Sequence, residues 1–211
     1  MPPRSYNIET RLQQQQSLRQ RIVEAAVQMH AAKGGLATTY GDIAQAAGVS
    51  LPTVHKHFPS ADELFRSCTG HVAALAPPVP AADILAAPSI EEAARMLVDA
   101  VDRVHAHFEP WKVWREHEHI QVLADIALRV RKDMTELCAG VLTRHDAATN
   151  VRETAAVWES LLDFEPWHRL VREHKLPRAT VRGVLAQLLL AVTGPQPAAP
   201  SSPRPKSRNP K

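Results

Sequence analysis

Residues 39–58, TYGDIAQAAGVSLPTVHKHF, constrain this chain more than any other segment, because they combine two short helices with a tight turn. Thr39 and Asp42 have the spacing of a capping box, which starts a helix. Gly48 stands where the chain must turn, and a residue without a Cβ turns at the least cost. Pro52 lies in the first turn of the second helix, where its missing N–H does no harm. This pattern predicts a helix-turn-helix, a unit that places a recognition helix in a DNA major groove.

The flanking sequence favours a complete three-helix domain over a helical hairpin that merely packs. Residues 17–33 repeat apolar side chains at intervals of three and four, as an amphipathic helix does. Ser60 and Glu63 have the capping spacing of a further helix, and Ser50 is predicted to cap the second helix of the motif. The expected core consists of Ile22, Ala26, Ile43, Val54, Phe58 and Leu64.

Residues 17–70 resemble the N-terminal domain of TetR-type (TetR/AcrR) transcriptional regulators. The resemblance rests on the segment RIVEAA at 21–26, on Gly35 and on the stretch 43–58. It implies that Val54 and Phe58 face the core while other residues face double-stranded operator DNA. The predicted DNA-binding residues are Thr39, Tyr40, Ser50, Leu51, Pro52, Thr53, His55, Lys56 and His57.

Two departures from the family pattern affect the expected contacts with phosphates. The family usually has Tyr at the place of His55 and Lys at the place of Ala61, and both family residues tend to touch DNA phosphates. An imidazole still donates a hydrogen bond, whereas a methyl group does not. We therefore expect the affinity for the DNA backbone to depend on Lys56, His57 and the N-terminal arm.

The whole chain is predicted to be all-α, because no apolar pattern of period two occurs. Capping residues and prolines predict helices from Ser60 to the prolines at 77–80, from Ser89 to Pro110, from a tryptophan-rich turn through Leu142, from Asn150 to about His174 with a break at Pro166, and from Pro177 through Val192. The predicted organisation is a flexible N-terminal arm at 1–16, the helix-turn-helix domain at 17–70, a helical regulatory and dimerisation domain at 71–195 and a disordered basic tail at 196–211.

Charge and composition agree with contacts to DNA at the ends of the chain. Residues 1–70 hold 7 Lys/Arg against 5 Asp/Glu, residues 71–195 hold 14 against 17, and residues 196–211 hold 4 against none. The tail is either a solvated segment or a non-specific contact to DNA. The two cysteines, Cys68 and Cys138, are expected to be reduced core thiols, which favours a cytoplasmic location.

Other protein classes find no support in the sequence. A membrane location is not expected, because no apolar run is long enough to span a bilayer and the start lacks the apolar core of a signal peptide. No phosphate-binding glycine loop, nucleophile elbow or zinc-protease motif occurs, so we expect no enzymatic activity and no cofactor.

The resemblance implies a homodimer, because the last two long helices of TetR-type proteins usually form a four-helix bundle with those of a second copy. Two such copies double the contact across a palindromic operator. Part of the apolar surface must also face the protein's own core, so which residues cross the dimer axis stays open. The predicted interface residues are Trp158, Leu161, Leu162, Leu185, Leu188, Leu189 and Val192.

The resemblance further implies that a small-molecule inducer binds the second domain and releases DNA. Large aromatic residues either fill a core or wall a cavity for a flat or apolar ligand. The predicted ligand-binding residues are Met96, Val101, Val104, His105, Phe108, Trp111, Trp114, Leu123, Met134, Trp158 and Phe164. The expected function is a ligand-responsive dimeric repressor; the alternative is a helical module that binds a partner protein.

Two His-x-His pairs raise a metal-responsive regulator as a further alternative. His105 and His107 precede the tryptophan-rich turn, and His117 and His119 follow it. Side chains at i and i+2 of a helix point about 200° apart, so neither pair chelates a metal from a regular helix. We therefore predict no metal ligand.

Overall fold

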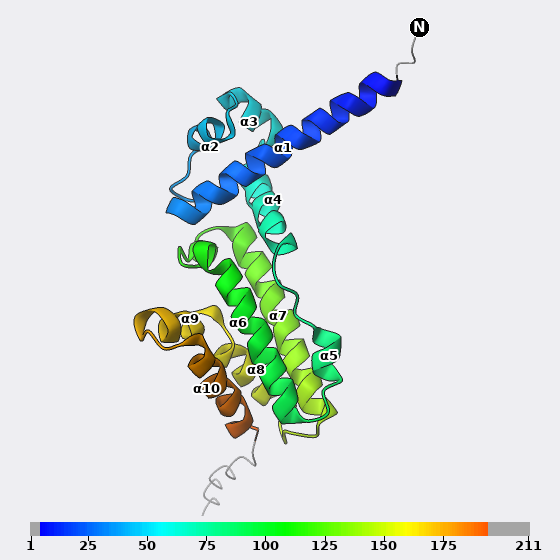
Figure 1. Cartoon of the computed structure of the whole chain (residues 1–211), viewed down its shortest axis with the longest axis vertical. Helices are drawn as coiled ribbons and strands as arrows, with labels where there is room; N and C mark the ends of the chain where they lie inside the picture. Colours follow the sequence, from blue (N-terminus) through cyan, green and yellow to red (C-terminus); the bar gives the residue numbers. More distant parts are fainter. Residues whose placement is uncertain (1–4, 194–211) are drawn as a thin grey trace, which may run out of the picture.

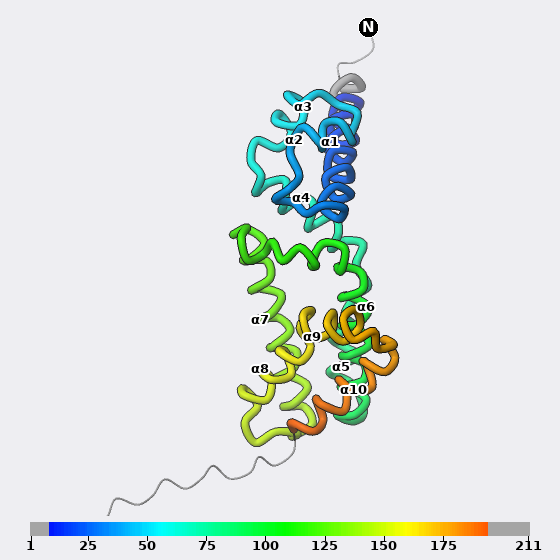
Figure 2. Tube along the Cα trace, turned by 90° about the vertical axis from the view of Figure 1, so that its left-hand side faces the viewer, coloured from blue at the N-terminus to red at the C-terminus, as the bar shows by residue number. Residues whose placement is uncertain are grey.

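The computed structural model describes residues 5–193, and within this range every regular element is a helix (Figure 1). The predicted all-α fold is confirmed. The tail at 196–211, predicted to be disordered, lies outside the described residues. Two separate apolar cores divide the described chain into an N-terminal and a C-terminal domain, which lie one above the other (Figures 1 and 2).

The N-terminal domain consists of four helices around one small core rather than the three predicted, because α4 adds Leu64 and Cys68 to the core of the helices before it. Every residue of the expected core is buried there. The first helix begins at Ser5, so the segment predicted as a flexible arm is helical from that residue onward. Nothing between Ser5 and Lys33 breaks a helix, and the glutamine run continues it; the first half of the helix extends beyond the domain (Figure 1), and residues 9–17 are exposed. The helices are α1 (Ser5–Lys33), α2 (Tyr40–Ala47), α3 (Leu51–His57) and α4 (Ala61–Ala74).

The C-terminal domain packs its helices around a larger core, in which Trp158 and Trp167 are the largest fully buried side chains. The two long helices α6 and α7 run down the length of the domain from a corner beneath the N-terminal domain (Figures 1 and 2). The elements are α5 (Ala81–Leu85), α6 (Ile90–Lys112), a short 3-10 helix (Glu116–Glu118), α7 (Gln121–Arg144), α8 (Val151–Leu161), α9 (Phe164–His168), a π-helical turn (Arg169–Glu173) and α10 (Arg178–Ala191).

Two helix breaks that the sequence predicted at prolines fall at other residues in the structure. Pro110 is inside the last turn of α6, where it removes only one backbone hydrogen bond, and the helix ends at Lys112. Pro166 occupies the first turn of α9, where an N–H has no partner within the helix. The break between α8 and α9 falls instead at residues 162–163, where the Asp163 carboxylate accepts a hydrogen bond of 2.6 Å from the Phe164 N–H.

A buried carboxylate joins three helices of the C-terminal domain. Asp102 of α6 is 2% exposed, and it accepts hydrogen bonds from Trp167 Nε1 at 2.8 Å, from Arg178 Nη2 at 2.8 Å and from Arg182 Nη1 at 3.1 Å. Burial alone would raise the pKa of Asp102, but the hydrogen bonds from Arg178, Trp167 and Arg182 outweigh it, so the pKa is lowered. This carboxylate therefore fixes α9 and α10 against α6.

Both cysteines are buried and unpaired, as predicted. Burial raises the pKa of the Cys68 and Cys138 thiols to about 12, so both stay protonated at neutral pH. Among the helices of residues 5–193, none is long and apolar enough to cross a membrane.

Replacement of Asp102 by Ala should destabilise the C-terminal domain. The change leaves the Trp167 N–H buried without an acceptor and removes the partner that Arg178 and Arg182 share, while water partly compensates the two half-exposed guanidinium groups. We expect the free energy of unfolding to fall by about 2 kcal/mol, measured by urea denaturation. Glu92→Ala, which removes a surface ion pair with Arg95, is the control and should change it far less. An unchanged stability of Asp102→Ala would contradict the role of this carboxylate.

Candidate DNA-binding site and its link to the second domain

The helix-turn-helix begins with the predicted capping box. Thr39 Oγ1 accepts a hydrogen bond from the Asp42 N–H at 3.1 Å, and the Asp42 carboxylate accepts one from the Thr39 N–H at 2.8 Å. Lys33 Nζ at the end of α1 lies 2.7 Å from the same carboxylate. The hydrogen bonds from Lys33 and Thr39 lower the pKa of Asp42. The start of α2 is thereby attached to the end of α1.

The turn between α2 and α3 has the predicted glycine geometry. Gly48 has a φ of +64°, in the left-handed region that glycine adopts without strain. Arg21 of α1 donates a hydrogen bond of 2.7 Å to the carbonyl of Ala47, at the C-terminus of α2. A cation at this end also interacts favourably with the helix dipole. The orientation of α2, and with it that of α3, is therefore held by α1.

The start of α3 differs from the prediction in one detail. Ser50 has the extended conformation of a capping residue, but its hydroxyl makes no cap to a backbone N–H. It lies instead 2.8 Å from Thr53 Oγ1, because a second hydroxyl stands at the position where a side-chain cap would reach. Pro52 lies in the first turn of the helix, as predicted.

The surface of α3 separates into a buried and an open face. Val54 and Phe58 are fully buried, as expected. The other side chains of α3 are predicted to contact DNA, and their position on the open face is compatible with such contacts. The exposed residues of this face are Ser50, Leu51, Pro52, His55 and Lys56, with Thr53 and His57 half-buried.

The two predicted contacts from the start of α2 are less open. The Thr39 side chain is exposed, but its hydroxyl is engaged in the cap. The Tyr40 hydroxyl is buried and has no hydrogen-bond partner among residues 5–193, and its ring lies 4.8 Å from the His55 ring. Burial raises the pKa of Tyr40. In this conformation the hydroxyl is therefore not available to a DNA phosphate, and the ring positions His55.

The corner between α6 and α7 is hydrogen-bonded to the end of α1, and we call Trp111, Trp114 and Glu116 the clamp. Trp111 Nε1 donates to the Val27 carbonyl at 3.0 Å, and Trp114 Nε1 donates to the Ala31 carbonyl at 3.3 Å. The Glu116 carboxylate accepts two hydrogen bonds from the turn that follows α1. Its partners are the N–H groups of Gly35 at 2.8 Å and of Leu36 at 2.7 Å.

Two glycines allow Glu116 to approach this turn. A Cβ on Gly34 would lie 2.8 Å from Glu116 Oε1, and the φ of Gly34 is +83°. A Cβ on Gly35 would lie 2.9 Å from Glu116 Oε2 and 2.5 Å from the Phe65 ring. From sequence alone, a pair of glycines directly after a helix indicates only where that helix ends. Their pairing with Glu116 carried no local signal, because the partner lies far along the chain.

The predicted ligand-binding residues separate into clamp, core and partly buried positions. Trp111 and Trp114 belong to the clamp, whereas Trp158 is fully buried and donates a hydrogen bond of 2.9 Å to the Leu189 carbonyl. Val101, His105 and Phe164 are also buried. Neither of two hollows on the described surface, one between α6 and α10 and one along α1, is lined by a residue of the predicted pocket. The partly buried residues are Met96, Val104, Phe108, Leu123 and Met134.

The histidines of the first His-x-His pair bind backbone carbonyls in opposite directions. His105 Nε2 donates to the Leu162 carbonyl at 2.8 Å, inside the core, and His107 Nε2 donates to the Val72 carbonyl at the end of α4, at 2.9 Å. His117 and His119 are exposed. Within residues 5–193 no three His, Cys, Asp or Glu side chains are grouped as a metal ion would require.

Comparisons with known proteins agree with this architecture. Residues 22–68 match the family of bacterial regulatory proteins described as the tetR family. No curated protein matches the chain. A solved TetR-like transcriptional regulator from Rhodococcus sp. RHA1 has a TM-score of 0.65 and 21% identity, covering 84% of this chain and 97% of that one. NalD of Pseudomonas aeruginosa has a TM-score of 0.61 and 19% identity, covering 83% and 96%.

A more distant organism provides the same fold. A transcriptional regulator from Aquifex aeolicus VF5 has a TM-score of 0.58 and 14% identity, covering 83% of this chain and 99% of that one. The N-terminal domain is thus a DNA-binding domain of the tetR family, and the chain has the fold of a TetR-type transcriptional regulator along nearly the whole length of these structures.

Lys56→Ala should weaken binding to every DNA sequence and reduce the slope of log affinity against log salt by about 1, as the loss of one phosphate contact does. Lys56 is exposed and has no ion-pair partner among the described residues, so the change should leave the fold intact. Fluorescence anisotropy at several salt concentrations measures both effects.

Thr53→Ala provides the contrasting variant in the same helix. It should weaken the selected site more than random DNA, because on the predicted orientation of α3 the Thr53 hydroxyl would hydrogen-bond to a base edge. Equal affinity and an equal salt slope for Lys56→Ala and the unmodified protein would show that α3 is placed wrongly against DNA.

Proposed function

We propose that this protein is a homodimeric transcriptional repressor that binds palindromic operator DNA and is released from it by a small molecule. The clamp is the observation that carries the proposal furthest. It attaches the end of α6, in the domain that would bind the ligand, to the end of α1. Helix α1 in turn holds α2 through Lys33 and Arg21. A displacement at the end of α6 therefore has a hydrogen-bonded route to the recognition helix.

The proposed dimer rests on apolar side chains that the protomer leaves uncovered. Val184 and Leu188 of α10 are 40% and 42% exposed, and Val157 of α8 is 43% exposed. Exposed apolar residues on the two helices expected to pair are what a four-helix interface requires. Dimerisation would set two α3 helices at the spacing of successive major grooves, about 34 Å.

The interface proposed here differs from the residues predicted from sequence. Four of those residues, Trp158, Leu162, Leu185 and Leu189, are buried in the protomer's own core. Leu188 is exposed, and Leu161 and Val192 are half-buried. We therefore assign the interface to the outer face of α8 and α10, formed by Val157, Val184 and Leu188.

Two solved structures of the same fold support the ligand-responsive part of the proposal. NalD is described as the secondary repressor of a multidrug efflux pump, and EbrR, 21% identical with a TM-score of 0.54, as a multidrug binding protein complexed with imidazole. Identities this low carry the fold rather than the ligand. For this protein, repression and release by a small molecule are therefore proposals.

Leu188→Glu should separate the dimer without unfolding the protomer. A carboxylate on the outer face of α10 would be buried in the interface without a partner, whereas in the monomer it is solvated. Analytical ultracentrifugation should then detect a monomer with unchanged helical circular dichroism. Leu189→Glu places the same charge in the core and should unfold the domain.

Leu128→Glu is the matched control, because Leu128 is 64% exposed on α7, outside the assigned interface. This variant should remain dimeric. A Leu188→Glu protein that stays dimeric would remove this face of α10 from the interface.

The repressor itself is tested by selecting bound fragments from genomic DNA and then screening compounds for release. We expect a palindromic site and at least one releasing compound. In Glu116→Gln the side chain has one oxygen for two N–H groups and turns an NH2 toward one of them, so the clamp is weakened. This variant should still bind the operator, but release should require about tenfold more compound, as the loss of a typical coupling free energy predicts.

Glu118→Gln is the control for the clamp, because it makes the same change two residues away in a surface ion pair with Arg115. Its release should match that of the unmodified protein. Binding that does not depend on the DNA sequence would contradict the proposed repressor. An unchanged release of Glu116→Gln from the operator would contradict the role of the clamp in coupling the two domains.

A further inference from the structure

Lys112 occupies the last turn of α6, next to the clamp residue Trp111, and has no close counter-ion. Its Nζ lies 5.1 Å from the centroid of the Phe164 ring. Among residues 5–193, no carboxylate oxygen lies within 4 Å of this ammonium. Burial lowers the pKa of Lys112, while the charge of Asp163 acts in the opposite direction. A partly buried cation held mainly by a ring face has lost hydration without gaining an ion pair.

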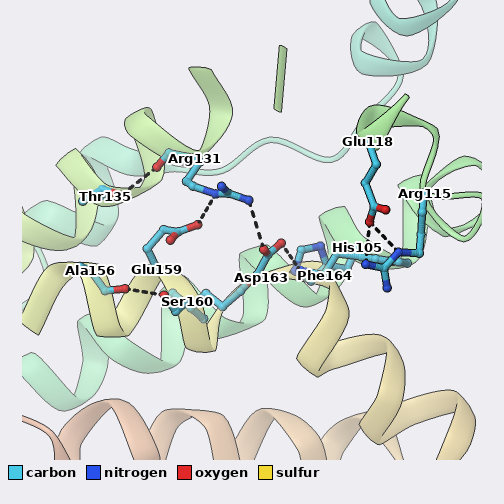
Figure 3. Close-up of polar contacts among 11 residues, drawn as sticks. His105, Arg115, Glu118, Arg131, Thr135, Ala156, Glu159, Ser160, Asp163 and Phe164 are labelled. Carbon is cyan, nitrogen blue, oxygen red and sulfur yellow. Dashed lines mark hydrogen bonds and ion pairs between the residues drawn. The ribbon is translucent and has the colours of Figure 1, made fainter. Parts of the chain in front are cut away.

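Asp163 and Glu165, which flank Phe164 in the sequence, are already engaged by arginines. Arg131 lies between Glu159 at 3.4 Å and Asp163 at 3.7 Å (Figure 3). Arg115 likewise pairs with Glu118 at 2.6 Å and with Glu165 at 3.2 Å. Each of these four carboxylates has a guanidinium partner, and none of them forms an ion pair with Lys112.

A second polar group with unused capacity meets the same aromatic ring. His105 is 6% exposed, and its ring lies edge-on to Phe164 with a centroid distance of 5.6 Å. Because a carbonyl only accepts, the bond to Leu162 places the proton of the neutral ring on Nε2. Burial lowers the pKa of His105 to about 4, so the ring is neutral at pH 7. Its Nδ1 is then a buried acceptor without a donor.

We propose that the ligand of the regulatory domain is a planar organic acid whose carboxylate pairs with Lys112. This inference rests on the proposed function and names the class of ligand. The apolar body of the acid would lie against Phe164 and against Phe108, which is half-buried and one helical turn before Lys112. A hydroxyl meta to the carboxylate, too far away to bond to that carboxylate itself, would supply the donor that His105 Nδ1 lacks. Neutral amides and organic cations would leave Lys112 unpaired.

The test measures binding to the full chain without DNA by isothermal titration calorimetry. The probes are 4-hydroxy-2-naphthoate, its primary amide and 2-naphthoate. The hydroxy acid should bind at least about tenfold more tightly than the amide, which has the same shape without the charge, as loss of a desolvated charge pair predicts. It should also bind several-fold more tightly than 2-naphthoate, which lacks the hydroxyl donor.

Variants of Lys112 identify the partner of the carboxylate. Lys112→Met should abolish the preference for the acid over the amide, and Lys112→Arg should retain most of it. Lys132→Met is the matched control, because Lys132 is an exposed lysine of α7 paired with Glu136 at 3.8 Å; it should bind as the unmodified protein does. Since Lys112 has no close counter-ion, Lys112→Met should not lower the melting temperature.

Each outcome decides for or against the proposal. Equal binding of acid and amide to the unmodified protein, no binding of the acid at millimolar concentration, or an acid preference that survives Lys112→Met would overturn it. The acid–amide comparison needs no variant to fold. Acid binding without release of operator would leave the ligand class standing and contradict the ligand-responsive repressor. Release of the operator by amides or cations alone would contradict the organic acid as the ligand class and leave the ligand-responsive repressor standing.

Discussion

The attachment of the α6–α7 corner to the end of α1 is the contact on which the relation between the two domains depends. Each domain has its own core, so apolar burial alone does not fix their orientation. The clamp does so with directional bonds, together with the hydrogen bond from His107 of α6 to the Val72 carbonyl of α4. The two oxygens of Glu116 accept two backbone N–H groups, and charge-assisted bonds of this kind are stronger than neutral ones. Two indole N–H groups bind carbonyls near the C-terminus of α1, where the helix dipole is negative.

The local part of this architecture was predictable from the sequence, because the interacting residues are close along the chain. The capping pair Thr39 and Asp42, the turn at Gly48 and the cap at Ser60 each join residues within a few positions, and all of them form as predicted. The buried face of α3 follows from helical periodicity in the same way. Ser50 is the exception, because the sequence does not reveal that Thr53 competes for its hydroxyl.

The clamp was not predictable, because its partners are far apart in the sequence and two of them are backbone groups. Tryptophans next to a proline favoured a pocket wall, since both their size and the parting of helices are typical of one. The indole N–H groups of Trp111 and Trp114 instead find carbonyls of α1. Backbone acceptors have no sequence signature, so only the packing of α6 against α1 selects this use of the tryptophans.

The sequence also does not show which apolar residues of α10 face the core and which face outward. Its apolar residues surround more than one face, so periodicity alone does not separate core from interface. Asp102 decides the rotation, because Arg178 and Arg182, one turn apart on α10, both bond to it. With these arginines held against α6, Leu185 and Leu189 turn inward and Leu188 remains outside. A buried carboxylate of α6 thus determines which residues of α10 are available to a second copy.

Helix α6 also connects the proposed ligand site with α1, which holds the recognition helix. A ligand shifts an equilibrium only by the difference in its affinity for the two conformations. Lys112 is adjacent to Trp111, so a carboxylate that pairs with Lys112 binds best to one position of the end of α6, and that position also determines the geometry of the clamp. Because the clamp joins α1 by hydrogen bonds, which lose strength steeply with distance and angle, a small shift there changes the energy of the domain contact. On the proposed function, the ligand and the operator would therefore be coupled through the end of α6.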